Sequence, residues 1–568
     1  MYYYASKLNE ASCSGCSIKV PQGPSESASV PSNLDQIPLN SDPANLHGSG
    51  LSYYDNDDYY SMVRGNKFIA ESGLKHIVMN GALSFVSAPK IDPSQIGAGG
   101  ERSEPEYREG QLVSATLDSL VEMLRPGASP TFTFTFLLCS RLFLKPHELL
   151  SRLCKRYFKN YDKVCNGERG GQAKADSKEC QERELAEMAA LVRVLTHWTG
   201  MFPYDFRDDR VMALVRSITQ RCAAEPMARV RGEVSSALER LLDKLTALEH
   251  YEASLNDVPQ LCAVDQLPQG DILSLGLTPV ELASQLTTIE LYRLSFVGPE
   301  EFVQAFAPTA PLPSAAAASP AAAATHSAHP AAISLRHAEA KSTRNLEAYA
   351  DWFNRLSYLV ATDIVKPLKS KQRARVMEQW VMTARECFNL GNFNSLMAII
   401  SALNMAPVAR LKKTWSRTSA VCGQQLRQLE LCVEPGGNHA RYRAALAAAP
   451  PDTAVPLLSV TCRDLHFANQ AQHTRLAGGR VNFEKCSALA RHVSAQLASR
   501  RLTEPVAQPS AAAQPHAHAH AHHLSAWHFF ADRPALSETA LELVSFEREP
   551  PVDHLEKERL KRLKGAAP

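Results

Sequence analysis

The sequence predicts an all-α protein with two helical domains. From about Leu112 onwards, apolar residues recur every three or four positions, which is the spacing that places them on one face of an α-helix. At 568 residues, 45% of them hydrophobic, the chain is long enough for two or three domains with sizeable cores. The 61 basic and 59 acidic residues leave a formal net charge of +2, so charge favours no nucleic-acid partner.

The cysteines and the first residues of the chain favour a cytoplasmic protein. The chain has 13 cysteines at irregular spacings, which argues against a disulfide framework and for a reducing compartment. The start shows no basic stretch followed by an apolar one, and no apolar run is long enough to span a bilayer. Any membrane contact is therefore expected to be at most peripheral.

Two features have residue types that bind metals, and we expect neither to do so. Cys13 and Cys16 lack a second cysteine pair at zinc-ligand spacing. The HAHAHAHH run at residues 516–523 lies in a low-complexity tract, where a solvated polar linker is the simpler interpretation. We therefore expect no metal site and no cofactor. The chain also lacks a GxxxxGK[ST] phosphate loop, so it is not expected to be a P-loop nucleotide-binding protein.

The first predicted helical domain covers residues 76–256. Residues 1–75, which precede it, are rich in Ser, Pro, Asn and Asp and show no sustained period, so we expect them to be disordered. The string LVSATLDSLVEML predicts the opening helix of the domain. Five apolar residues of that string would share one helical face: Leu112, Leu117, Leu120, Val121 and Leu124.

The second predicted domain covers residues 257–565. Its first helix has a capping box at Thr278 and Glu281, with Pro279 in the first helical position. Two tracts rich in Ala, Pro and His, at residues 307–343 and 500–523, bury too little apolar surface to offset the entropy of ordering. We expect both to be disordered inserts.

Two segments of the second domain have strong helical patterns. In residues 385–415, a buried stripe is expected on a helix that ends near Asn404 and Pro407. The stripe consists of Leu396, Ile399, Ile400 and Leu403. Residues 455–497 predict a helical hairpin, with a turn at Gly478 and Gly479 and a returning helix capped by Asn482. The returning helix would bury Phe483, Cys486, Ala490, Val493 and Leu497.

Three strings of the sequence are distinctive: LGNFNSLMAIISALNMAPVARLKKTW in the second domain, and RLFLKPHELLSRLC and HWTGMFPYDFRDDRVM in the first. They closely resemble the Ras-type guanine-nucleotide exchange factors, the RasGEF family, and in particular the RasGEF-domain family one proteins. The first string resembles the RasGEF catalytic domain, and the other two resemble the Ras-exchanger motif that precedes it. The resemblance implies a helical bowl with a protruding hairpin, braced by the N-terminal module. It also implies that the chain releases GDP from a small GTPase of the Rap or Ras type.

Such an exchange factor makes and breaks no covalent bond, so it is not expected to be an enzyme in the ordinary sense. A nucleotide bound in the picomolar range is held by about 16 kcal/mol, and the exchange factor must substitute its own contacts for those of the nucleotide. In the family the hairpin is the wedge. By resemblance, His466 occupies the position of a hydrophobic wedge residue and Gln470 that of a glutamate near the Mg²⁺ and phosphate site. An amide carries no negative charge, so Gln470 would compete less with the phosphates.

Three further residues are candidate GTPase contacts by resemblance. Asn404 falls on an asparagine that contacts the switch region in the family, and its alternative role is a helix cap. Ala409 stands where better-known members have an aromatic contact. Asn438 is a candidate contact, with a helix cap as its alternative role.

The sequence also departs from the family pattern. The stretch 416–455 is altered where the family has an ordered helix, and residues 500–523 replace family sequence. These departures, together with Gln470, leave open a second hypothesis, a non-catalytic or exchange-weak scaffold that binds the GTPase. A helical adaptor unrelated to GTPases is the third hypothesis.

Overall fold

The structure is a computed structural model that describes residues 104–165, 175–223, 227–257, 261–263, 270–304, 343–450, 453–499, 527–531 and 533–566. The segment 1–75 and the tract 500–523, both expected to be disordered, lie outside these residues. So does the tract 307–343 except for its last residue, Thr343, which is buried directly before a helix.

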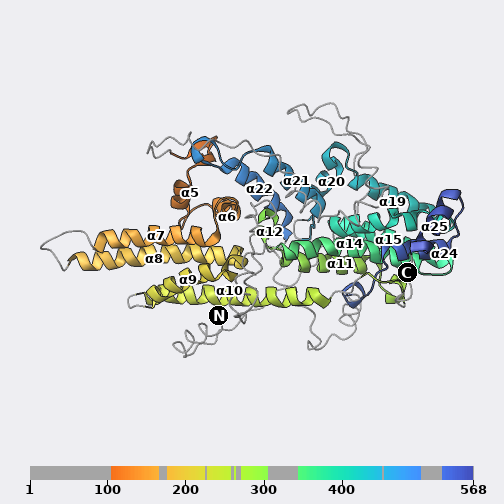
Figure 1. Cartoon of the computed structure of the whole chain (residues 1–568), viewed down its shortest axis with the longest axis horizontal. Helices are drawn as coiled ribbons and strands as arrows, with labels where there is room; N and C mark the ends of the chain where they lie inside the picture. The colour runs from red at the N-terminus through yellow and green to blue at the C-terminus, as the bar shows by residue number, and fades with distance from the viewer. Residues whose placement is uncertain are drawn as a thin grey trace, which may run out of the picture.

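The predicted all-α fold class is confirmed, and helices form two groups along the long axis of the molecule (Figure 1). The N-terminal group is drawn in orange and yellow in Figure 1 and includes two long helices, α8 and α10. Its helices are α5 (Leu117–Met123), α6 (Pro130–Cys139), α7 (Pro146–Cys165), α8 (Ala175–Met201), α9 (Asp209–Cys222) and α10 (Ala228–Ser254). Short 3-10 turns lie between these helices at Ser140–Leu142 and Pro203–Arg207, and another follows α10 at Leu255–Asp257.

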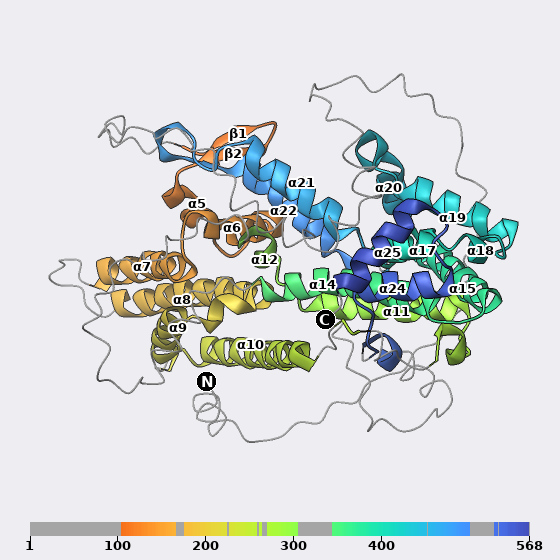
Figure 2. The same cartoon turned by 45° about the vertical axis from the view of Figure 1, so that its right-hand side comes forward.

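The C-terminal group contains the remaining helices. Its first part comprises α11 (Pro279–Ser295), α12 (Pro299–Gln304), α14 (Arg344–Val365), α15 (Ser370–Asn389), α16 (Phe393–Asn404), α17 (Ala406–Ala409) and α18 (Lys412–Trp415). Its second part comprises α19 (Ala420–Val433), α20 (Gly436–Ala448), α21 (Leu458–Ala471), α22 (Phe483–Gln496), α24 (Glu538–Arg548) and α25 (His554–Ala566). Further 3-10 turns lie at Ile272–Leu275 and Ala477–Gly479. The turned view in Figure 2 separates α21 and α22, which extend from this group towards α6.

One part of the first predicted helix is wrong. Leu112 lies in a strand, β2 (Gln111–Ala115), and the helix α5 begins only at Leu117. β2 is the middle strand of a small antiparallel sheet with β1 (Glu106–Arg108) and β3 (Val481–Asn482). Leu112 pairs with Tyr107 of the neighbouring β1, across a turn at Glu109 and Gly110. The end of β2 also pairs with β3, which comes from the other helical group.

A buried carboxylate organises the centre of the C-terminal group. Glu290 on α11 accepts hydrogen bonds from the indole of Trp352 on α14 and from Asn394 and Ser395 on α16. Burial raises the pKa of Glu290, and the hydrogen bonds from Ser395, Asn394 and Trp352 oppose that shift. The network therefore fixes the relative positions of three helices by directional bonds as well as by packing.

The local signals in the second domain behave as predicted. Thr278 and Glu281 form a capping box at the start of α11, with Pro279 in the first turn. α16 ends at Asn404, and its predicted stripe is buried: Leu396, Ile399, Ile400 and Leu403.

The stretch 416–455, which seemed altered, contains two helices. Ser419 caps α19 by accepting a hydrogen bond from the backbone N–H of Cys422. Leu426 and Leu429 of α19 are buried against the rest of the group. The departure from the family pattern in this stretch therefore lies in residue identity, and an ordered helix does follow Trp415.

None of the helices in the described residues combines the length and the apolar character needed to cross a membrane.

Candidate functional site

The candidate site is built on a helical hairpin, α21 and α22, which pack side by side. α21 buries Leu458, Val460, Cys462 and Leu465. The predicted apolar side of α22 is buried in full: Phe483, Cys486, Ala490, Val493 and Leu497. These residues form the dry interior of the hairpin, so the opposite side of α21 is the side available to a partner.

The base of the hairpin is held by hydrogen bonds. The Tyr442 hydroxyl on α20 accepts the backbone N–H of Leu457, 2.8 Å away, just before α21 begins. Gln496, fully buried at the end of α22, donates to the Pro456 carbonyl at 3.3 Å and accepts from the Thr461 hydroxyl at 2.6 Å. The start of α21 is thus tied both to its neighbour helix and to the bowl.

The tip of the hairpin is held by a buried lysine. The ammonium of Lys485, on the first turn of α22, donates to the carbonyls of Asn469 at 2.7 Å and Gln472 at 2.9 Å and to the Thr474 hydroxyl at 3.0 Å. These acceptors include the carbonyl groups at the C-terminal end of α21, where a cation is favoured. Burial lowers the pKa of Lys485, and the three acceptors compensate for the lost hydration.

The connection between α21 and α22 contains the turn and the helix cap that the sequence predicted. Gly478 and Gly479 have φ values of 71° and 73°, in the left-handed region that favours glycine. Asn482 caps α22 as predicted, because its side chain accepts the backbone N–H of Lys485 at 3.0 Å. The cap sets where α22 begins.

Four residues at helical spacing point out from one side of α21: Arg463, His466, Phe467 and Gln470. His466 is half-buried, Gln470 is exposed, and Phe467 is 60% exposed. Sequence reasoning missed Phe467, although its position four residues after Arg463 and three before Gln470 places it on the same face. We define these four residues as the hairpin face.

Asn438 is joined to the hairpin face. Its side-chain oxygen accepts a hydrogen bond from Arg463 at 2.7 Å, and its backbone carbonyl accepts from Arg443 at 2.9 Å. The helix-cap interpretation of Asn438 is wrong, because Asn438 has φ 59° and lies between two other left-handed residues, Gly437 and His439. Its side chain therefore serves the contact between α20 and α21.

Asn404 and Ala409 lie on a different part of the bowl. Asn404 is the last residue of α16, and its amide donates to the Glu430 carboxylate on α19 at 3.0 Å. Ala409 is exposed at the end of α17. The five predicted site residues thus form two groups, with His466, Gln470 and Asn438 at the hairpin and Asn404 and Ala409 at the floor.

The N-terminal helices brace the hairpin from the other side. In the sheet, Ser114 of β2 pairs with Asn482 of β3, and Arg480 donates to the Ser114 hydroxyl and carbonyl, each at 2.9 Å. Phe132 of α6 stacks on Phe483 of α22 with ring centroids 5.4 Å apart. This contact fixes the orientation of the hairpin by packing as well as by hydrogen bonds.

The site offers recognition contacts more than reactive groups. Among the residues described by the structure, no three or more His, Cys, Asp or Glu side chains are grouped so as to hold a metal ion. Asp464 on α21 forms ion pairs with Arg443 at 2.7 Å and with Arg463 at 3.5 Å, so its charge is used to join α20 and α21.

Both helical groups match domain families of known proteins. The RasGEF N-terminal motif matches residues 111–220, and the RasGEF domain matches residues 281–487. The human Ras-GEF domain-containing family member 1B is 37% identical over 482 residues, which are 81% of this chain and 92% of that protein. The chain belongs to the RasGEF family. It is also similar to Ras-GEF domain-containing family member 1B-A of Danio rerio, at 37% identity over 81% of this chain and 85% of that protein.

A further RasGEF relative, the human Ras-GEF domain-containing family member 1C, is 34% identical over 85% of this chain and 96% of that protein. The chain is accordingly a Ras-family exchange factor, and its partner is a small GTPase of the Ras family. The hairpin tip, including Lys485, falls within the matched RasGEF domain.

Replacing Lys485 by methionine is expected to slow GDP release about tenfold, since loss of three charge-assisted hydrogen bonds loosens the end of α21. Lys485 is a positioning residue, so the maximal rate should fall more than the affinity for nucleotide-free GTPase. The maximal rate is measured as the rate of fluorescent GDP release at a saturating concentration of the exchange factor. Lys485→Arg keeps a donor and should restore part of the rate; equal loss in both variants, or a loss of affinity alone, would contradict the role.

Acidification is expected to destabilise the fold through His439. Burial, followed by the positive charges of Arg463 and Arg443, lowers the pKa of His439 to about 4. Between about pH 4 and about pH 6.5, His439 of the unfolded chain binds a proton and His439 of the folded chain does not. The free energy of unfolding therefore falls as the pH drops through about 6.5. Between about pH 7 and pH 4.5 the wild type should lose about 2 kcal/mol more free energy of unfolding than His439→Asn. Equal losses in denaturant titrations would show that His439 does not carry this effect.

Proposed function

We propose that the hairpin face opens the nucleotide site of a Rap-type or Ras-type GTPase. The observation that carries this proposal is Phe467, a large apolar side chain that is 60% exposed on a helix whose two ends are both fastened. A rigid helix with an exposed aromatic group is suited to insert into a partner, because little conformational entropy is lost on binding. Phe467 and the half-buried His466 act as the wedge.

Gln470, one helical turn beyond His466, would meet the region of the GTPase that holds the Mg²⁺ and phosphates. As a neutral amide it both donates and accepts hydrogen bonds, so it can occupy polar groups that the nucleotide leaves. The floor residues Asn404 and Ala409 would contact the switch region, and Asn438 would support the hairpin through Arg463. No covalent step is needed, since contacts with the exchange factor replace those of the nucleotide.

We also propose the domain division and the compartment expected from the sequence. The family matches at residues 111–220 and 281–487 support a Ras-exchanger domain over 76–256 and a catalytic domain over 257–565. Eight cysteines, among them Cys139 and Cys387, are free thiols, which supports a reducing and hence cytoplasmic setting.

A scaffold that binds the GTPase without efficient exchange is the second candidate function. The uncharged Gln470 favours it, because a carboxylate would repel the phosphates more strongly. The altered stretch 416–455 does not favour the scaffold, since α19 and α20 are folded and contact the neighbouring helices.

The release of fluorescent GDP from purified Ras and Rap GTPases separates the two functions when the full-length chain is added. Acceleration for at least one of them supports exchange. Tight binding to the nucleotide-free GTPase without acceleration supports the scaffold. The absence of both acceleration and binding would contradict both proposals.

Replacing Gln470 by glutamate is expected to keep the exchange rate equal to the parent or raise it up to about fivefold, because a charge near the phosphates adds about 1 kcal/mol. The same assay with the responsive GTPase measures the rate. Gln424→Glu, the same change at an exposed position of α19, is the matched control and should have no effect. A clear loss in Gln470→Glu alone would contradict the placement of Gln470 against the phosphate site.

A further inference from the structure

The helix α16 is enclosed by the rest of the C-terminal group except along one side. Ten of its twelve residues are buried, and Met397 and Asn404 are half-buried. Ser401 follows Met397 by four residues and precedes Asn404 by three, so the three side chains share one side of the helix. Ser401 is 9% exposed, and within the described residues its hydroxyl has no hydrogen-bond partner. Because a buried hydroxyl without a partner is unfavourable, this side of α16 is suited to receive a polar group of a bound protein.

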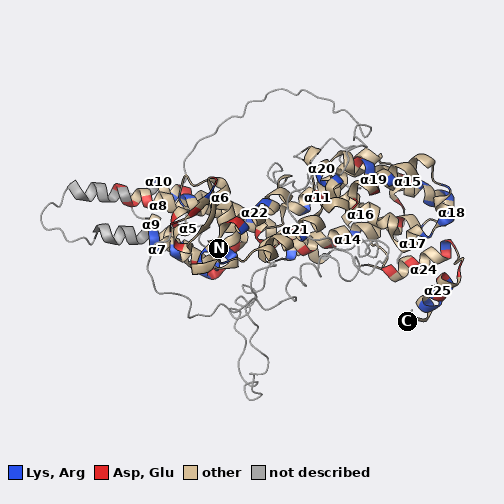
Figure 3. Ribbon diagram, turned by 90° about the horizontal axis from the view of Figure 1, so that it is seen from above, with Lys and Arg blue, Asp and Glu red and all other residues tan. Residues whose placement is uncertain are grey.

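The helix α19 supplies a carboxylate to the end of α16. The two helices contact each other, and Figure 3 shows them beside each other in the C-terminal group. Nδ2 of Asn404 donates a hydrogen bond to Oε1 of Glu430 at 3.0 Å, and both side chains are half-buried. Within the described part of the chain, neither side chain has a second hydrogen bond or an ion pair. Each therefore depends on the other for its position.

The carboxylate fixes which way the Asn404 amide points. A carboxylate has acceptor oxygens only, whereas a side-chain amide has an NH₂ donor on one side and a carbonyl acceptor on the other. If the amide turned over, Oδ1 of Asn404 would face the oxygens of Glu430, and two acceptors form no hydrogen bond with each other. Oδ1 of Asn404 is therefore held on the side of the amide that faces away from Glu430.

We propose that Glu430 is a positioning residue for the GTPase, because it orients Asn404 so that the switch region must offer a hydrogen-bond donor at this point. The role rests on the proposed function, in which Asn404 contacts the switch region. An amide that is oriented before binding loses less conformational freedom when the GTPase arrives. The fixed orientation also disfavours a partner that offers an acceptor. Glu430 acts through Asn404 and does not need to touch the GTPase.

Three variants of the full-length chain test the orientation through their affinity for nucleotide-free Ras or Rap GTPase. Glu430→Gln can turn its own carbonyl oxygen towards Asn404, so its affinity should stay within about threefold of the parent. Glu430→Lys places a donor there and turns the Asn404 amide over, so the affinity should fall about tenfold or more. Combined with Asn404→Asp, Glu430→Lys should bind within about threefold of the parent, because an aspartate accepts on both sides.

A matched control separates orientation from charge. Glu434→Lys makes the same charge change at an exposed position one turn beyond Glu430, and its affinity should stay within about threefold of the parent. The thermal unfolding midpoint of Glu430→Lys should stay close to the parent, since a lysine can still bond to Oδ1 of Asn404. Equal losses of affinity in Glu430→Lys and Glu434→Lys would overturn the proposal. A combined variant that binds as weakly as Glu430→Lys would overturn it too.

Asn404→Ala distinguishes failure of this proposal from failure of the proposed function. An unchanged affinity in Asn404→Ala, or no binding by the wild type, would overturn both the contact of Asn404 with the switch region and its positioning by Glu430. A loss in Asn404→Ala with equal affinities for Glu430→Gln and Glu430→Lys would support the contact and overturn only the positioning. Because affinity is measured instead of rate, the test applies equally to an exchange factor and to a non-catalytic scaffold.

Discussion

Replacing Phe467 by aspartate is expected to lower the rate of GDP release about 30-fold. The side chain is 60% exposed, so its loss removes little of the packing within the hairpin. A buried aromatic anchor in an interface contributes about 2 kcal/mol or more to binding, which corresponds to about a 30-fold change. Fluorescent GDP release from the responsive GTPase measures the rate, and the thermal unfolding midpoint of the variant should stay close to the parent.

Two matched variants separate this role from a general effect of charge. Phe467→Leu keeps an apolar wedge and should retain most of the rate. Val280→Asp places the same acid on α11 at a position that is 58% exposed, and it should leave the rate unchanged. If Phe467→Asp exchanges nucleotide as fast as Val280→Asp, the hairpin face is not the wedge.

Replacing Arg373 by methionine is expected to lower the free energy of unfolding by about 3–5 kcal/mol, because it leaves a buried carboxylate without its cation. Arg373 on α15 is 1% exposed and pairs with Glu549 at 3.1 Å. Glu549 also accepts the backbone N–H groups of Lys413 and Thr414 at 2.9 Å. The pair therefore connects α15, α18 and the end of α24, and its loss should release the C-terminal helices.

Denaturant titration of the full-length chain measures this loss. Arg373→Met with Glu549→Gln removes both charges and should recover part of the stability, since no buried charge is then left unpaired. A loss below about 1 kcal/mol in Arg373→Met would show that water or a local rearrangement replaces the guanidinium.

The features that sequence predicted correctly depend on local patterns. The capping box of α11, the end of α16 at Asn404 and the cap of α22 by Asn482 each involve residues within a few positions of one another. Such signals act within a turn or two of helix, and a single sequence contains all the information they need. The positions of His466 and Gln470 on one side of α21 follow from the same helical period.

The features that sequence did not predict depend on contacts between distant segments. The end of β2 pairs with β3, which follows more than 300 residues later, although Leu112 itself pairs with Tyr107 of the neighbouring β1. Lys485 is a positively charged residue in an amphipathic helix and would be assigned to the surface, yet it is 4% exposed beneath the hairpin tip. Phe467 is apolar and would be assigned to the core, yet it points outward. Asn438 joins α21 because of its left-handed backbone, which no local pattern indicated.

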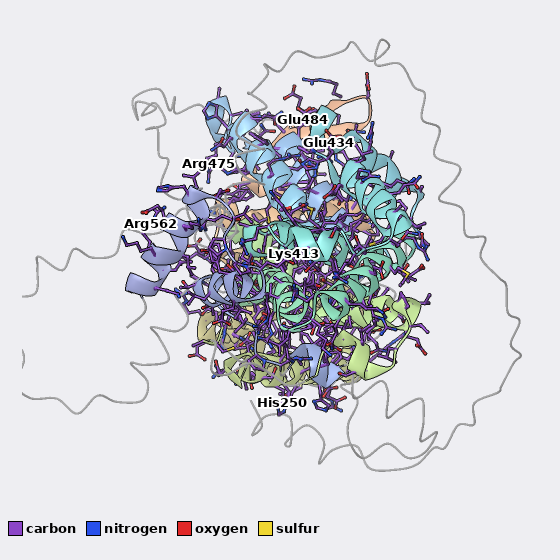
Figure 4. All side chains as sticks on the ribbon, turned by 90° about the vertical axis from the view of Figure 1, so that its right-hand side faces the viewer. His250, Lys413, Glu434, Arg475, Glu484 and Arg562 are labelled. Carbon is purple, nitrogen blue, oxygen red and sulfur yellow. The ribbon has the colours of Figure 1, made fainter. Side chains whose placement is uncertain are left out.

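The central claim is that the hairpin face contacts the GTPase, and crosslinking tests it most directly. A photoreactive benzoylphenylalanine replaces Phe467 in one variant and His250, on α10, in the control; Figure 4 shows His250 on the opposite side of the molecule from the hairpin residues Arg475 and Glu484. With nucleotide-free GTPase, the first variant should crosslink to the switch segments and the control should not. Crosslinks from position 467 to other parts of the GTPase, or equal yields from both positions, would contradict the account.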